Sequence, residues 1–258
     1  MTQLIQAICS DLDGTLLDDD KQISTENVVA IRRWQQAHRL FGITSGRQYD
    51  GVIRALAGQV EPDFVVCLNG AEIHAIDGRI SRHPLTNADA QQVLQILGQY
   101  RFARLMITIA GKTYLTDQEL SIVAGSTIAS VLTATAPAIE KIGLQTSDPV
   151  KLQRVLAQMA ALPVNATWSD RQYVEISGHG VSKFSGLREA LSGRVPLARV
   201  AAVGDYGNDM AIVKGVGRGY AVANAVPTLK KAADALTTAN NDAAIAHVIA
   251  ELLPRGGV

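Results

Sequence analysis

Short apolar runs alternate with longer segments of mixed character along the first 70 residues of the chain. Each apolar run has the length of a strand rather than of a buried helix. The runs expected to form strands are residues 5–9, 40–44 and 64–68. Residues 26–38 and 48–57 are expected to form helices, with Ser24 as a suitable N-cap for the first. This order predicts a parallel sheet with right-handed crossover connections.

The pattern changes in the middle of the chain, where hairpin signals replace the regular alternation. Asp77-Gly78 and Gly111-Lys112 each separate two strand-like runs, and Asp148-Pro149 is typical of a helix start. The expected strands are residues 104–109, 113–115, 137–144, 164–168 and 172–176, and the expected helices are residues 87–100 and 148–159. We therefore expect an inserted α+β domain with antiparallel strands at residues 83–181.

The first pattern then resumes. The expected elements are a helix at residues 182–191, short strands at 200–203 and 220–222, and helices at 228–233 and 243–252. The sequence thus predicts an α/β fold, in which residues 1–82 and 182–258 form a doubly wound, Rossmann-like parallel sheet core.

The composition of the chain bears on which kinds of binding partner and which compartment are expected. The chain has 258 residues with 24 basic and 24 acidic side chains, so its zero net charge gives no electrostatic reason to expect nucleic acid or an anionic membrane. No apolar run approaches the length that crosses a bilayer, and no signal peptide is visible. Cys9 and Cys67 lie in apolar strand-like runs and are expected to be reduced and buried. These features predict a cytoplasmic protein.

Two carboxylates follow the first strand. Asp11 and Asp13 are two residues apart, with Gly14 behind them, and alternate residues of extended chain point the same way. Because such carboxylates repel each other, a hard divalent cation is the simplest candidate for what lies between them. The same residues also fit an ordinary solvated turn. The acidic run at residues 18–20, followed by Lys21, is expected to be an exposed turn.

The second and third strands also end in polar residues. Ser45-Gly46-Arg47 follows the second, where a hydroxyl and backbone amides at a strand-to-helix junction can cradle a phosphate. Arg47 can add a fork of donors for phosphate or carboxylate. The alternative is that Ser45 is a simple helix N-cap. Asn69-Gly70 ends the third strand, and ligands of open α/β sheets bind at such strand ends.

A lysine and a second acidic strand end complete the set. Lys183 stands in the first turn of a predicted helix, where it opposes the helix dipole and so faces either solvent or an anion. Asp209 could hold it there. Gly204-Asp205 and Asn208-Asp209 follow the strand at residues 200–203, although a Gly-rich turn with an Asp cap explains them equally well.

Together these residues closely resemble the haloacid dehalogenase superfamily of phosphatases, specifically the Cof-type branch with an inserted α+β cap, over essentially the whole chain. The four motifs are Asp11-x-Asp13-Gly14-Thr15, Ser45 before Gly46-Arg47, Lys183 after Val181-Ser182, and Gly204-Asp205-x-x-Asn208-Asp209. Lesser matches are Asn69-Gly70-Ala71, Glu175-Ile176 and Asn224-Ala225. The chain departs from the family at Phe184, Val222-Ala223 and Asp242-Ala243, which removes no chemical group from the expected site.

The resemblance implies a Mg²⁺-dependent phosphatase whose aspartyl-phosphate forms on Asp11. Asp13 would be the general acid and base, and Asp209 would orient Lys183. The implied Mg²⁺ ligands are Asp11, the backbone carbonyl of Asp13, and Asp205. The implied substrate and phosphate contacts are Ser45, Gly46, Arg47, Asn69, Lys183 and Asn208. The inserted domain, residues 83–181, would close over the site as a cap.

The resemblance leaves alternatives open. A phosphomutase on the same scaffold would return the phosphoryl group to the sugar, and a non-catalytic phosphosugar sensor would bind without turnover. The expected substrate is a small phosphorylated metabolite such as a hexose or polyol phosphate, and the low aromatic content of 5% slightly disfavours a large stacked leaving group. The residues of the inserted domain that could contact it are His83, Arg104, Lys112, Tyr114, Lys141, Trp168 and Arg171.

Overall fold

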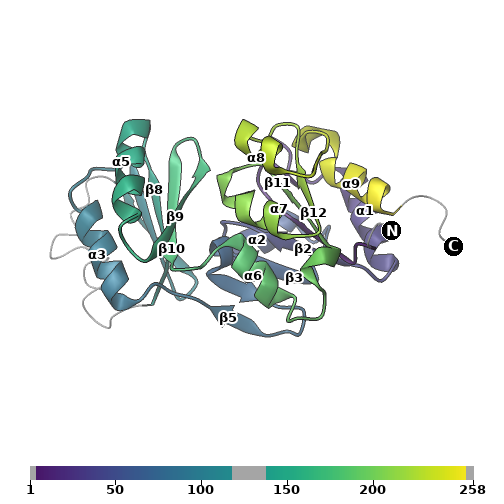
Figure 1. Ribbon diagram of the computed structural model, residues 1–258, viewed down its shortest axis with the longest axis horizontal. Helices are drawn as coiled ribbons and strands as arrows, with labels where there is room; N and C mark the ends of the chain where they lie inside the picture. Colours follow the sequence, from purple (N-terminus) through teal and green to yellow (C-terminus); the bar gives the residue numbers. More distant parts are fainter. Residues whose placement is uncertain (1–3, 118–137, 254–258) are drawn as a thin grey trace. The chain divides into compact units, whose positions relative to one another are not determined.

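The structure is a computed structural model that describes residues 4–117 and 138–253. The chain divides into two compact units, one formed by Met1–Ser81 with Lys183–Val258 and the other by Arg82–Ser182. The first predicted residue of the strand at 137–144 lies outside the described residues. Each unit has its own sheet (Figure 1).

The first unit is built on an eight-stranded sheet. Its strands are β1 (Ala7–Ser10), β2 (Leu40–Thr44), β3 (Phe64–Cys67), β4 (Glu72–His74), β5 (Ile80–Arg82), β11 (Val200–Gly204), β12 (Arg218–Ala221) and β13 (Ala235–Leu236). Their order is β13-β12-β11-β1-β2-β3-β4-β5. All pairs from β13 to β3 are parallel, and β4 joins β3 antiparallel. The strand order reverses at β1, so β1 and its neighbours meet at the switch point where α/β folds bind ligands.

Six helices of the described residues pack against this sheet or against one another. They are α1 (Thr25–Gln36), α2 (Tyr49–Leu56), α6 (Lys183–Ala190), α7 (Met210–Gly215), α8 (Pro227–Ala232) and α9 (Ala244–Leu252). α1 packs against α9, while α7 packs against both α6 and α8 (Figure 1). Ser24 caps α1 as expected, because its side chain accepts a hydrogen bond of 3.2 Å from the amide of Asn27. The α/β fold with a parallel sheet is thus confirmed.

The second unit is an α+β arrangement. Its elements are α3 (Asn87–Leu97), β6 (Arg104–Ile109), β7 (Lys112–Asp117), β8 (Ile139–Gln145), α5 (Pro149–Met159), β9 (Val164–Asp170) and β10 (Tyr173–Gly178). The strands pair antiparallel in the order β7-β6-β8-β10-β9. One face of this sheet carries the buried residues of the unit's core, such as Ile107, Leu144 and Val174, which pack with Val93 and Val155 of the two helices.

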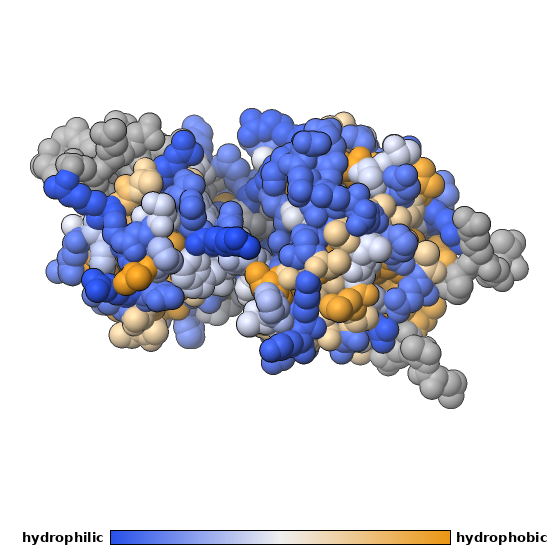
Figure 2. All heavy atoms as spheres, turned by 90° about the horizontal axis from the view of Figure 1, so that it is seen from above, coloured by the Kyte–Doolittle hydropathy of each residue, from blue (hydrophilic) through white to orange (hydrophobic). Residues whose placement is uncertain are grey.

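Sequence patterns placed most elements within two or three residues of their observed bounds. The strand β13 was missed because it is only two residues long, and the six-residue helix α7 was also missed. Cys9 and Cys67 are free and buried, as expected. No helix among the described residues is both long and apolar enough to cross a membrane. The face of the molecule drawn in Figure 2 is mostly hydrophilic, with hydrophobic side chains in small scattered groups that need no partner.

Candidate active site

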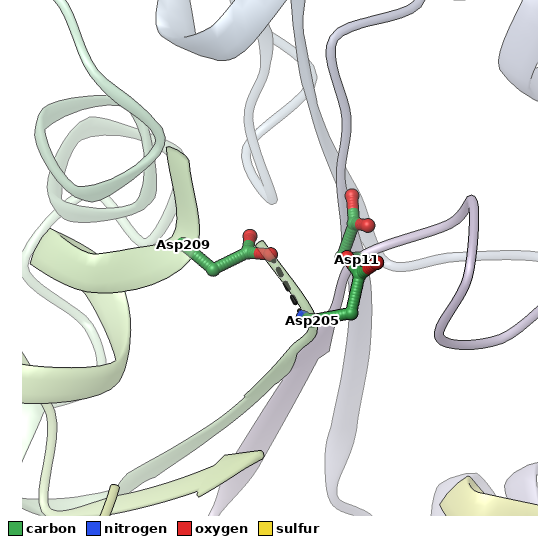
Figure 3. Close-up of side chains that lie close together, drawn as sticks. All are labelled: Asp11, Asp205 and Asp209. Carbon is green, nitrogen blue, oxygen red and sulfur yellow. Dashed lines mark hydrogen bonds between the residues drawn. The ribbon is translucent and has the colours of Figure 1, made fainter. Parts of the chain in front are cut away.

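Adjacent parallel strands bring the two acidic strand ends together. Ser10 of β1 lies opposite Val203 of β11, and the amide of Asp11 extends this ladder by donating 2.9 Å to the carbonyl of Val203. Asp11 and Asp205 therefore leave the same edge of the sheet side by side, although they are far apart in sequence. Asp209 approaches them from the turn that precedes α7 (Figure 3).

The three carboxylates converge tightly. One oxygen of each of Asp11, Asp205 and Asp209 lies within 4.8 Å of the others. Burial, reinforced by neighbouring carboxylates, raises the pKa of Asp205 to about 9. Burial also raises the pKa of Asp11 to about 7, although Lys183 opposes the rise. Two acidic groups in this arrangement require either a shared proton or a cation between them.

Lys183 supplies one positive charge to this cluster. Its Nζ donates 2.7 Å to Oδ1 of Asp11 and 2.6 Å to Oδ1 of Asp209, and its side chain is only 1% exposed. Burial by itself would lower the pKa of Lys183, but the two carboxylates outweigh it and raise the pKa. The lysine in the first turn of α6 therefore faces anions, not solvent.

Asp209 is occupied on both of its oxygens. While Oδ1 accepts from Lys183, Oδ2 accepts from the backbone amides of Asp205 at 3.0 Å and Tyr206 at 3.2 Å. These contacts fix the lysine and the loop that carries Asp205. Asp11 and Asp205 are consequently the members of the cluster with coordinating capacity to spare, and they could hold a divalent cation.

Glycine is required at two positions of the cluster. Gly14 has φ +74°, and a Cβ there would lie 2.6 Å from Oδ2 of Asp205. A Cβ at Gly204 would lie 2.5 Å from Cβ of Asp209. Both carboxylates therefore occupy space that any larger residue would fill. The side-chain Nδ2 of Asn224 also donates 2.8 Å to the backbone carbonyl of Gly14 and so ties this turn to the loop after β12.

Asp13 lies outside the three-carboxylate cluster. Its carboxylate accepts two hydrogen bonds from Arg47, at 2.6 and 2.7 Å, and one of 3.0 Å from Lys21. Burial would raise the pKa of Asp13, but these two cations, Arg47 above all, lower it. Lys21 was expected only as part of an exposed turn, and nothing in the local pattern indicates that it contacts Asp13.

The Ser45 loop is held by its own hydrogen bonds. The Ser45 hydroxyl, 1% exposed, accepts 3.1 Å from the amide of Arg47, and the Ser45 amide donates 2.8 Å to the carbonyl of Val66. The helix-cap alternative is wrong, because α2 is preceded by Gln48 as its N-cap and no side chain caps it. Since the hydroxyl accepts from Arg47, its own proton is directed elsewhere and can reach a ligand.

A left-handed turn brings Asn69 to Asn208. Leu68 and Asn69 have φ of 50° and 55°, which is uncommon for residues with side chains and typical of functional sites. Asn208 donates 3.3 Å to Oδ1 of Asn69, and its own Oδ1 is buried with no partner among the described residues. A buried acceptor of this kind needs a donor or a cation to satisfy it.

The residues proposed for leaving-group contacts divide by position in the second unit. Tyr114 and Trp168 pack against its apolar core. Lys141 forms a buried ion pair with Glu175, a partner that sequence reasoning did not consider. The remaining candidates are partly or fully exposed: His83, Arg104, Lys112 and Arg171.

Comparison with known proteins places the chain among related hydrolases. A family model described as haloacid dehalogenase-like hydrolase matches residues 8–249. Phosphatase YwpJ of Bacillus subtilis is 26% identical, over 96% of this chain and 100% of its own length. The 5-amino-6-(5-phospho-D-ribitylamino)uracil phosphatase YcsE of the same species is 26% identical, over 95% and 94%. The solved structure of a haloacid dehalogenase-like hydrolase from B. subtilis has a TM-score of 0.83 at 25% identity, over 96% of this chain and 100% of that one.

Proposed function

The chain belongs to the haloacid dehalogenase-like hydrolases, and from this premise we propose that it is a Mg²⁺-dependent phosphatase of small phosphate monoesters. The observation that carries the proposal is the convergence of Asp11, Asp205 and Asp209 on Lys183 at the switch point of the sheet. Curated relatives that match nearly its whole length are phosphatases.

The residues at the site fit a divalent cation. Asp11, which is buried, and Asp205 each place a carboxylate oxygen within 4.8 Å of the other, and carboxylate oxygen is the ligand that Mg²⁺ prefers. These two residues and the backbone carbonyl of Asp13 would hold the ion. When bound, Mg²⁺ supplies positive charge that keeps both carboxyl groups ionised and offsets the charge of a phosphate dianion.

Asp11 is the proposed nucleophile. Its carboxylate oxygen bonds to phosphorus while the bond from phosphorus to the leaving alkoxide breaks, which gives an aspartyl-phosphate. Because Arg47 and Lys21 lower the pKa of Asp13, Asp13 must take up a proton from solvent before the first step, and it donates that proton to the alkoxide. In the second step Asp13 takes a proton from water, the water oxygen bonds to phosphorus, and inorganic phosphate leaves Asp11. Lys183, the Ser45 hydroxyl and the Nδ2 amide of Asn208 donate to the phosphoryl oxygens in both steps.

The proposed substrate class is a sugar or polyol phosphate. The relative YcsE acts on a phosphoribityl compound, as its name states, and hydroxyl-rich leaving groups suit the exposed polar side chains of the second unit, such as Arg104 and Lys112. This unit would serve as the cap that excludes water and selects the leaving group.

The test is phosphate release from a panel of sugar and polyol phosphates. We expect turnover with Mg²⁺, none in EDTA, and recovery when Mg²⁺ is returned. Asp11→Asn should lower turnover about a thousandfold or more with an unchanged circular dichroism spectrum, whereas Asp50→Asn, an exposed carboxylate of α2, should behave as wild type. Near-normal turnover by folded Asp11→Asn refutes the proposal. Isomer formation without phosphate release would indicate a phosphomutase, and binding without turnover a sensor.

A further inference from the structure

The guanidinium of Arg47 binds the carboxylate of Asp13. Its Nε donates 2.7 Å to Oδ2 of Asp13 and its Nη2 donates 2.6 Å to Oδ1, so both oxygens are bound by one planar fork. Its Nη1 lies 3.5 Å from the carbonyl oxygen of Gly51. A two-point contact of this kind fixes the plane and direction of a carboxylate, which a single point charge does not.

The backbone of Arg47 is fixed as firmly as its side chain. Its amide donates 3.1 Å to the Ser45 hydroxyl, and its carbonyl accepts 2.9 Å from the amide of Leu68. Leu68 is held in a left-handed conformation, with φ 50°. The loop that presents the Ser45 hydroxyl therefore also sets where the Arg47 fork lies, and through it the carboxylate of Asp13.

A phosphate bound to the Nε and Nη2 edge of the Arg47 guanidinium would have to displace the carboxylate of Asp13. Asp13 would then keep only the contact with Lys21, a flexible and largely exposed side chain whose Nζ lies 3.0 Å away. We propose that Arg47 is a positioning residue, which holds the carboxyl of Asp13 in place for proton transfer, and that it is not a ligand of the substrate phosphate. This inference rests on the proposed two-step phosphatase mechanism.

The two roles predict different kinetics, because Asp13 acts once as acid and once as base. An activated ester such as p-nitrophenyl phosphate has a good leaving group, so formation of the aspartyl-phosphate needs little help from an acid, while its hydrolysis still needs the base. An alkyl ester such as glycerol phosphate needs both. Loss of a phosphate ligand would instead weaken binding of every ester and slow the first step with each of them.

The experiment is stopped-flow and steady-state kinetics of Arg47→Gln with both esters. We expect a burst of p-nitrophenol approaching one per active site, followed by a steady rate at least tenfold below wild type, with KM for p-nitrophenyl phosphate not raised. With glycerol phosphate we expect slow turnover and no burst. Arg47→Lys should behave in the same way, because it keeps the charge and loses the fork. Arg32→Gln, at an exposed arginine whose guanidinium donates to the Gln59 carbonyl, is the matched control.

Several outcomes would overturn the proposal. A raised KM, with no burst and an equal loss of kcat/KM for the two esters, would make Arg47 a phosphate ligand. Wild-type kinetics in Arg47→Gln would leave it without a role. Asp13→Asn, measured alongside, should show the same burst. Normal turnover by Asp13→Asn, or no phosphate release by the wild-type chain, would refute the two-step mechanism and the positioning role with it.

Discussion

Replacement of Lys183 by Met tests the electrostatics of the site without a large change of shape. The Nζ of Lys183 lies 2.7 Å from Asp11 and 2.6 Å from Asp209, and its side chain is 1% exposed. Met fills similar volume but leaves two buried carboxylates without their cation. Oδ2 of Asp209 retains its two backbone donors, so Asp11 bears most of the loss.

The magnitude follows from the burial of the pair. Removing one partner of a buried ion pair costs about 3–5 kcal/mol, and for a chain of this size each kcal/mol lowers Tm by about 2–4 °C. We therefore expect Tm in metal-free buffer at pH 8 to fall by about 6–20 °C. The loss should be smaller at pH 5. Without Lys183, the pKa of Asp11 in the folded state rises further. The folded state then keeps a proton on Asp11 that the unfolded state loses above the ordinary Asp pKa of about 4, so the stability of the variant decreases as pH rises.

Lys183 itself does not cause this pH dependence. Its pKa is raised in the folded state, so its contribution is fully present below the ordinary lysine value of about 10.4 and wild type keeps it at both pH values. The assay is differential scanning calorimetry at pH 5 and pH 8 in EDTA. Lys214→Met, at an exposed position of α7, is the matched control. A Tm change of less than about 3 °C at pH 8, or an equal change at both pH values, would refute the reasoning.

Three further predictions concern metal binding and local stability. Because the pKa values of Asp11 and Asp205 are raised to about 7 and 9, Mg²⁺ must displace protons when it binds. Its affinity should therefore rise up to about tenfold per pH unit for each proton displaced between pH 6 and 8. Calorimetric titration in two buffers of different ionisation enthalpy should detect the released protons, and a pH-independent affinity would contradict the prediction. Gly14→Ala should weaken Mg²⁺ binding at least tenfold in the same titration, because the new Cβ would lie 2.6 Å from Oδ2 of Asp205, whereas Gly58→Ala, with φ +71° and no atom within 4 Å of its Cβ, should share the strain but not the binding loss. Ser24→Ala should cost about 1 kcal/mol in urea unfolding through loss of the α1 cap, and an unchanged midpoint would show that the cap contributes nothing.

Local patterns in the sequence were enough to predict most of the elements. The apolar runs that became β1, β2 and β3 are short and bounded by polar residues. The capping residues Ser24 and Asp148 stand where the backbone donors of α1 and α5 need an acceptor. These signals act within a few residues, so they can be read from the sequence without knowledge of the sheet. The position of Asp11 at a strand end follows from the same short-range logic.

The tertiary structure alone decided which of these side chains meet. Lys183 is separated from Asp11 by 172 residues and from Asp209 by 26, and only the neighbouring positions of β1 and β11 bring their loops together. The fork from Arg47 to Asp13 likewise depends on β2 lying on the other side of β1. A strand pattern specifies that a residue ends a strand, but the strand's neighbours depend on the packing of the whole sheet, and so the contacts that give each carboxylate its charge state are not encoded locally.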